Sequence, residues 1–164
     1  MIVRKGEAKD MKAVLALIQE LADFENEPQA VAITEADLIR DGFNEQPLFS
    51  VFVAETDSLN PLQPHKIVGI ALYYYRYSTW KGKTIHLEDL VVNAAMRGKG
   101  IGHALYAEVI KQAQKDQVLR VEWNVLDWNK GAIAFYEKTG ATVFREWNTV
   151  QMDAAAIQQF ISHL

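Results

Sequence analysis

A run of alternating glycines is the sharpest chemical signal in the sequence. The stretch Arg97-Gly98-Lys99-Gly100-Ile101-Gly102 stands between a predicted strand and a predicted helix. Glycines accept positive φ and let the backbone approach a ligand closely, while the start of a helix offers unpaired N–H groups and a positive dipole end. This arrangement favours a phosphate or pyrophosphate ligand, with a glycine-rich turn that binds nothing as the alternative.

The spacing of this glycine turn excludes two familiar phosphate-binding loops. A Walker A loop ends in Gly-Lys-Ser/Thr, whereas Gly102 is followed by His103. A dinucleotide-binding fingerprint has the spacing G-x-G-x-x-G, whereas the glycines here follow G-x-G-x-G. The turn therefore belongs to neither class.

Two adjacent carboxylates, Glu88 and Asp89, lie in a predicted strand over Thr84–Val92. Neighbouring side chains of a regular strand point to opposite faces, so both could serve one ligand only if a β-bulge intervened. Carboxylates of this kind can accept a proton or hold a cation. The alternative for both is a structural acceptor or a solvated charge at a strand end.

A predicted helix over Asn129–Lys138 carries the third chemical signal. At 3.6 residues per turn, Asn129, Ile133 and Tyr136 share one face of this helix. A tyrosine hydroxyl on such a face can donate a proton, or it can pack in the core and bond to a backbone carbonyl. Asn129 also has the residue type of a helix N-cap.

These motifs resemble the GNAT N-acetyltransferase superfamily. The pattern Arg97-x-x-Gly100-x-Gly102 matches its acyl-CoA pyrophosphate loop, Q/R-x-x-G-x-G/A. Three stretches resemble the spermidine/spermine (diamine) N-acetyltransferase family, closest to its thialysine N-acetyltransferase-like branch: EADLIRDGF (35–43), STWKGKTIHLEDLVV (78–92) and VLDWNKGAIAFYEKTGA (125–141). The resemblance runs in order from the first helix to about Val150.

The resemblance implies an α/β protein with the GNAT fold, in which helices flank a mixed central sheet. It implies direct, acetyl-CoA-dependent transfer of acetyl to the primary amine of a small di- or polyamine or of a lysine-like amino acid such as thialysine. Tyr136 is the implied proton donor and Glu88 lies at the amine. A non-catalytic acyl-CoA-binding module, against which both residues argue, and a protein-lysine acetyltransferase are the alternatives.

The resemblance also assigns binding residues and a partner. The cofactor contacts are Leu90, Val91, Val92, Arg97, Gly98, Lys99, Gly100, Ile101, Gly102, His103, Asn129 and Tyr136. The acceptor-site residues are Phe24, Glu25, Glu88, Asp89, Glu122, Trp123 and Asn124. Where Phe24 stands, the family often has Tyr, so one polar contact is lost. A homodimer with acceptor sites near the subunit interface is implied as well.

Composition narrows the remaining possibilities. The chain has 164 residues, of which 49% are hydrophobic, so we expect a single domain (1–164) with its own core. It has no cysteine, which excludes a thiol nucleophile, an acyl-cysteine intermediate and Cys-ligated metals. The histidines lack metal-ligand spacing, so no metal is expected. The net charge of −4 argues against broad nucleic-acid binding. Without a signal peptide or membrane span, a cytoplasmic location is expected.

Apolar periodicity and capping residues predict the elements that must position these groups. We expect strands over Ile2–Arg4, Leu48–Ala54, Lys66–Tyr77, Thr84–Val92 and Leu119–Val125, and an extended segment, a hairpin, over Thr142–Met152. We expect helices after Asp10, between Thr34 and Gly42, from Ile101 to Ala113, over Asn129–Lys138 and after Asp153. Thr56–His65 is expected to be a hairpin connection.

Overall fold

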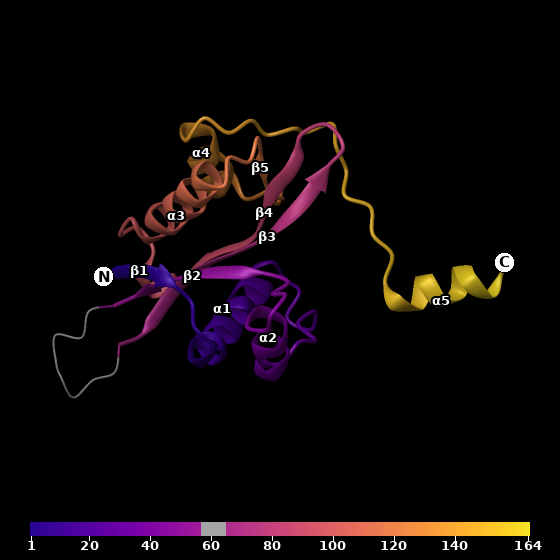
Figure 1. Ribbon diagram of the computed structural model, residues 1–164, viewed down its shortest axis with the longest axis horizontal. Coiled ribbons are helices and arrows are strands. Elements are labelled where there is room, and N and C mark those ends of the chain that lie inside the picture. Colours follow the sequence, from indigo (N-terminus) through magenta and orange to yellow (C-terminus); the bar gives the residue numbers. More distant parts are fainter. Residues whose placement is uncertain (57–64) are drawn as a thin grey trace. The chain divides into compact units, whose positions relative to one another are not determined.

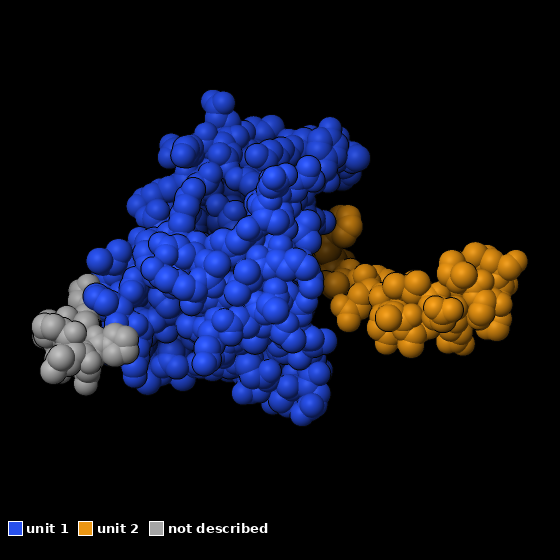
Figure 2. All heavy atoms as spheres, turned by 60° about the horizontal axis from the view of Figure 1, so that its bottom comes forward, with its two compact units in different colours: residues 1–124 blue, residues 125–164 orange. Residues whose placement is uncertain are grey.

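The computed structural model describes residues 1–56 and 65–164 of the chain. Of the predicted hairpin connection, only the end residues Thr56 and His65 lie within the described residues. The chain divides into two compact units, residues 1–124 (unit 1) and 125–164 (unit 2), coloured separately in Figure 2. The single domain over 1–164 stays a prediction, and each unit is described by itself.

Unit 1 is built around a mixed five-stranded sheet. The strands are β1 (Ile2–Lys5), β2 (Ser50–Glu55), β3 (Ile67–Ser78), β4 (Gly82–Val92) and β5 (Val121–Glu122). They are ordered β1-β2-β3-β4-β5, antiparallel as far as β4, and β5 pairs parallel to β4. The parallel pair is joined by α3 (Ile101–Lys115), which confirms the predicted βαβ unit and the mixed sheet.

Helices cover both faces of this sheet, as Figure 1 shows. On one face, α1 (Met11–Phe24) and α2 (Glu35–Gly42) bury an apolar stripe against β2, β3 and β4. The residues of this core include Met11, Val14, Leu17, Leu38, Val53, Ile70, Leu72 and Val91. On the other face lies α3, whose Leu105 and Val109 are completely buried. Short 3-10 turns, η1 (Ala8–Asp10) and η2 (Ala94–Met96), precede α1 and α3.

Unit 2 contains two helices, α4 (Lys130–Lys138) and α5 (Ala154–Ser162). The side-chain oxygen of Asn129 accepts from the N–H of Ala132 at 3.1 Å, so Asn129 caps α4. Asp153 caps α5 in the same way, accepting from Ala156 at 2.7 Å. Both predicted helices are confirmed. No helix within the described parts of the chain is long and apolar enough to cross a membrane.

Three predictions about local structure were wrong. Thr142–Met152 forms no strand, because unit 2 otherwise contains only helices and offers no strand with which to pair. The strand over Leu119–Val125 is reduced to the two residues of β5. Asp10 stands at the start of α1, but its carboxylate does not cap that helix: it accepts from the Glu7 N–H at 2.8 Å and pairs with Arg4 at 2.7 Å.

Candidate active site

A β-bulge interrupts β4 where the two adjacent carboxylates lie. The register between β3 and β4 passes from Leu72–Asp89 directly to Tyr73–Leu87, so Glu88 is the extra residue. A bulge disturbs the strict alternation of side chains and re-aims those beside it. The structure therefore contains the irregularity that two neighbouring carboxylates need if they are to face one ligand.

Glu88 and Asp89 line the same cavity, of about 310 Å³. The other walls come from α1, from α2 and the segment before it, from the segment leading into β2, and from β3: Ile18, Ile33, Asp37, Leu38, Asp41, Leu48, Phe49 and Leu72. Four carboxylates and an otherwise apolar lining suit a ligand with a cationic group on an aliphatic chain. Asp37 and Asp41 are already paired with Arg40, at 2.5 and 2.8 Å.

The electrostatics distinguish Asp89 from its neighbours. Burial, together with the nearby charges of Glu88 and Glu25, raises the pKa of Asp89 to about 6. Partial burial of its carboxyl group likewise raises the pKa of Glu25, the residue that follows α1. Like charges and desolvation both disfavour the ionised form. A bound cation would relieve both effects, and carboxylates perturbed in this way are common in functional sites.

The glycine turn between β4 and α3 has the geometry that its sequence predicts. Gly98 and Gly100 have φ values of +75° and +78°, a region that favours glycine. Gly102 has ordinary φ, and a Cβ there would come no closer than 3.6 Å to Val92. No side chain of the described residues caps α3 at Gly100, its N-cap. The start of α3 is therefore suited to an anionic ligand.

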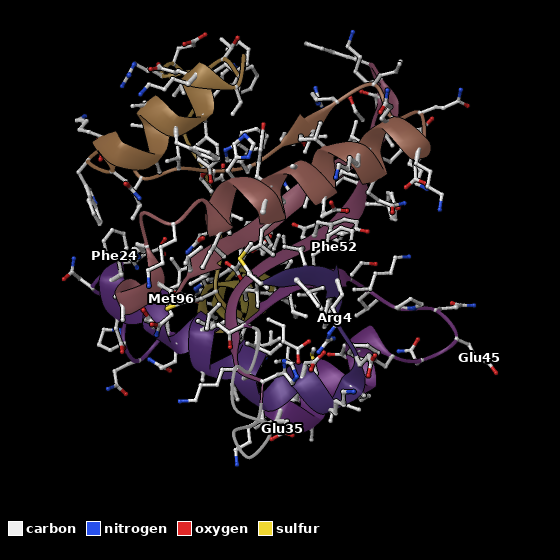
Figure 3. The ribbon with its side chains drawn as sticks, turned by 90° about the vertical axis from the view of Figure 1, so that its left-hand side faces the viewer. Arg4, Phe24, Glu35, Glu45, Phe52 and Met96 are labelled. Atoms are coloured by element: carbon white, nitrogen blue, oxygen red, sulfur yellow. The ribbon has the colours of Figure 1, made fainter. Side chains whose placement is uncertain are left out.

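The flanking residues of the turn are held by α1 and β4. The Nε of Arg97 donates to the Val92 carbonyl at 3.1 Å, and its guanidinium lies 5.3 Å from the Phe24 ring centre. Phe24 and Met96, labelled in Figure 3, accordingly lie at the same end of unit 1. The carboxylate of Glu20 accepts from the Ala94 N–H at 2.6 Å. The end of α1 thus stabilises the loop that leads into the glycine turn.

The edge of β4 that faces β5 is only partly occupied within unit 1. There, the β4–β5 ladder pairs Ile85 with Val121 and His86 with Glu122 and extends no further. Leu90, Val91 and Val92, the predicted pantetheine contacts, lie beyond that ladder and pair with β3 on the opposite edge. An extended ligand could bond to backbone groups along this part of β4.

The other predicted acceptor residues lie in and after β5, where Glu122 pairs in register with His86 of β4 but does not line the cavity. Both carboxylate oxygens of Glu122 are paired, with Arg76 at 2.7 Å and Arg120 at 2.9 Å. The Trp123 ring meets Tyr106 edge-on, with 5.7 Å between centroids, and Asn124 is exposed. A role for these residues in binding the acceptor stays a prediction. Because Glu122 is already paired with two arginines, it has less negative charge to offer an amine.

The predicted proton donor lies in unit 2. Tyr136 is 8% exposed and shares a buried face of α4 with Ile133. Its backbone carbonyl accepts a hydrogen bond from the Thr139 hydroxyl at 2.7 Å. The helix ends there, and Gly140 follows with a φ of +91°. The catalytic role of Tyr136 stays a prediction.

Comparison with known proteins identifies the family. The model described as "Acetyltransferase (GNAT) family" matches residues 15–141, most of the chain. The chain belongs to this family. It is thus an acetyltransferase with the GNAT fold, which confirms the predicted family, fold and class of enzyme. GNAT acetyltransferases use acetyl-CoA, and the positive-φ glycines before α3 fit its pyrophosphate.

Three individual proteins show what this chain is similar to within and beyond the family match. Thialysine N-epsilon-acetyltransferase of Bos taurus is 37% identical over 163 residues, covering 96% of this GNAT chain and 95% of that protein. Spermidine/spermine N(1)-acetyltransferase-like protein 1 of Homo sapiens is 38% identical over 139 residues, covering 85% of this chain and 20% of that protein. An integron cassette protein of V. cholerae shares the fold, with a TM-score of 0.75 at 22% identity, covering 98% and 96% of the two chains.

Sequence reasoning missed three residues around Glu88 and Asp89. Asp37 and Asp41 line the cavity, but no chemical motif in the sequence marks them, and the residue type and position of Asp37 indicate a helix capping box with Thr34. His86 contacts Glu88 and was considered only as a metal ligand. Its position two residues before Glu88 on a strand was a signal that could have found it. No cluster that could hold a metal ion occurs among residues 1–56 and 65–164.

Proposed function

We propose that this GNAT chain transfers acetyl from acetyl-CoA directly to the primary amine of a small di- or polyamine or of a lysine-like amino acid such as thialysine. The observation that carries the proposal is the bulge that brings Glu88 and Asp89 to one cavity of about 310 Å³. Relatives named for thialysine and for spermidine/spermine support the same class of acceptor.

The carboxylate pair suits the first requirement of the reaction. A free alkylammonium has a pKa near 10.4, so it must lose a proton before its nitrogen can attack. In the proposed step Glu88 takes that proton, directly or through water. Asp89 and Glu25 add negative charge that attracts the cationic substrate, with Phe24 beside them at the end of α1.

The transfer forms the carbon–nitrogen bond of the amide and breaks the carbon–sulfur bond of the thioester. As the amine nitrogen bonds to the carbonyl carbon, it loses its second proton to water. Tyr136 gives a proton to the departing sulfur and is reprotonated from water. The net products are the N-acetylated amine, the CoA thiol and one proton. Because the chain has no cysteine, no acyl-cysteine can intervene, which supports direct transfer.

The residues that would hold acetyl-CoA are those around the glycine turn. Backbone N–H groups from Gly98 to His103 would bind its pyrophosphate, with Arg97 and Lys99 supplying positive charge. The backbone of Leu90–Val92 would lie beside its pantetheine, and Asn129 would add a contact from the start of α4. When bound, acetyl-CoA supplies the activated acetyl group.

A panel of amines tests this proposal. Purified protein is given acetyl-CoA with spermidine, putrescine, thialysine or lysine, and release of CoA thiol is followed. We expect turnover with at least one of them, and a lower kcat/KM for that amine in Glu88→Gln with acetyl-CoA affinity unchanged. Absence of turnover with all four overturns the proposal, and acetylation of lysine peptides alone would assign a protein substrate instead.

The assembly and the partners also belong to this proposal. We expect a homodimer, a small cationic amine as substrate, no nucleic-acid or membrane partner, and a cytoplasmic location. Sedimentation equilibrium tests the first expectation, and a mass of one chain at micromolar concentration would contradict it.

A further inference from the structure

A buried histidine lies against the proposed proton acceptor, and the mechanism above does not use it. His86, on β4, is 7% exposed. Its Nε2 lies 3.5 Å from Oε2 of Glu88, and its ring centroid lies 5.2 Å from that of Tyr74. Glu88 also lies near Tyr74, where its charge helps to raise the pKa of the Tyr74 hydroxyl. The half-exposed Glu88 carboxylate thus lies beside a buried imidazole and near a tyrosine.

Arg76 determines which nitrogen of His86 carries the proton. Its Nη1 lies 3.1 Å from Nδ1 of His86. A guanidinium has only N–H donors and no acceptor, so Nδ1 must accept this hydrogen bond and carries no proton. The single proton of the neutral ring is then on Nε2, the atom that faces Glu88. The same guanidinium is held by Glu122 at 2.7 Å.

We propose that His86 is a positioning residue, whose neutral Nε2–H holds the Glu88 carboxylate in place for the acceptor amine without cancelling its negative charge. The inference rests on the proposed function, because it requires Glu88 to meet the amine. A lysine or an imidazolium at this position would neutralise Glu88 and weaken its attraction for a cation. A carboxylate has enough acceptor sites to serve His86, Tyr74 and an ammonium together.

The surroundings of His86 keep its ring neutral. Burial lowers the pKa of His86, and Arg76 lowers it further, although Glu88 and Glu122 act in the opposite direction. The titratable and charged groups around the ring are thus Tyr74 and Arg76 on β3, Glu88 on β4 and Glu122 on β5. A second proton would have to enter at Nδ1, directly beside the guanidinium.

Two substitutions of His86 distinguish the effect of its Nε2–H donor from the effect of the packing of its ring. His86→Phe keeps a ring against Tyr74 but has no N–H, whereas His86→Gln can place an amide N–H near the position of Nε2. We expect kcat/KM for the amine to fall about tenfold or more in His86→Phe, with KM for acetyl-CoA unchanged, and to be largely restored in His86→Gln. Wild-type kinetics in His86→Phe, or an equal loss in both variants, overturns the inference.

Substitution of Arg76 tests the charge of the ring. In Arg76→Met the Nδ1 position is open to a proton, so we expect kcat/KM for the amine to fall more steeply than in wild type as the pH is lowered from 8 to 6. Arg120→Met, which removes the other partner of Glu122 but leaves Arg76, is the matched control and should keep the wild-type profile. Identical profiles for Arg76→Met and wild type contradict the role of Arg76.

A measurement without substrate keeps this inference separate from the proposed function. If no amine is acetylated, the proposed function fails, but ¹⁵N chemical shifts of the His86 ring still report its tautomer. We expect a protonated Nε2 and an unprotonated Nδ1 at pH 7. The reverse pattern, or a cationic ring, overturns the inference whatever the substrate is.

Discussion

Replacement of Asp89 by asparagine should make the protein more stable at neutral and alkaline pH while it impairs catalysis. Asp89 is largely buried on β4 beside two other carboxylates, and its pKa is raised to about 6 from 3.8. No cation within the described residues pairs with it. Asparagine has nearly the same shape but no charge, so Asp89→Asn removes the ionisation and leaves the packing.

The magnitude follows from the pKa of Asp89. The folded state binds the proton more tightly than the unfolded state, so the group's contribution to stability is present below pH 3.8 and is lost as pH rises through about 6. One pKa unit corresponds to about 1.4 kcal/mol, and the rise therefore corresponds to about 3 kcal/mol. We expect Asp89→Asn to gain up to about 3 kcal/mol at pH 8 and less than about 1 kcal/mol at pH 4.

Urea unfolding of wild type and Asp89→Asn at several pH values measures this difference in the free energy of unfolding. The contributions of the other titrating groups are the same in both proteins and cancel when the two values are subtracted. Asp41→Asn is the matched control: Asp41 lines the same cavity, but it is paired with Arg40, so its loss should not stabilise the protein. Turnover of Asp89→Asn should fall although its stability rises. A variant that is less stable than wild type at pH 8, or a difference that does not vary with pH, refutes the reasoning.

Four further substitutions test the other parts of the site and the sheet. Tyr136→Phe should lower kcat by about 10²-fold or more and leave the acetyl-CoA Kd, measured by calorimetry, unchanged; undiminished turnover would remove its assigned role. Gly100→Ala places a side chain at φ +78° and should cost about 1–2 kcal/mol in urea unfolding, while Gly102→Ala, whose Cβ would make only an ordinary contact with Val92 at 3.6 Å, should be nearly neutral. Gly69→Ala would bring a Cβ to 2.9 Å from both Leu105 and the Val91 carbonyl, so we expect a loss of about 1–3 kcal/mol in the same assay; a neutral result would mean that α3 can shift away from β3.

Local patterns predicted most of the fold because they act over a few residues. The stripe of α1 follows helical spacing, and the Thr34–Asp37 pair forms the capping box that its residue types indicate. A strand, in contrast, depends on a neighbour with a free edge. The segment 142–152 has strand-like composition but no strand partner in unit 2, and its sequence alone could not reveal this.

The candidate site could be predicted only where its residues follow one another in the chain. The glycine turn and the adjacent pair Glu88 and Asp89 are local motifs, and the structure shows the expected turn. The bulge at Glu88 was only a condition for a shared ligand and was not predicted. The contributions of Asp41 and of the Arg76–His86 contact depend on how α2 and β3 lie against β4. Such long-range placement leaves almost no trace in a single sequence.

The partners of the carboxylates in unit 1 indicate which kind of ligand the cavity at Glu88 and Asp89 binds. Several carboxylates elsewhere in this unit have arginine partners, among them Asp10 with Arg4, Asp41 with Arg40, and Glu122 with Arg76. At the bulge, Glu88 lies beside a neutral imidazole and near the Tyr74 hydroxyl, and Asp89 is kept beside like charges at a cost in stability. Among the described residues, Glu88 and Asp89 lack the cationic partner that those paired carboxylates have, and an alkylammonium from outside would supply it.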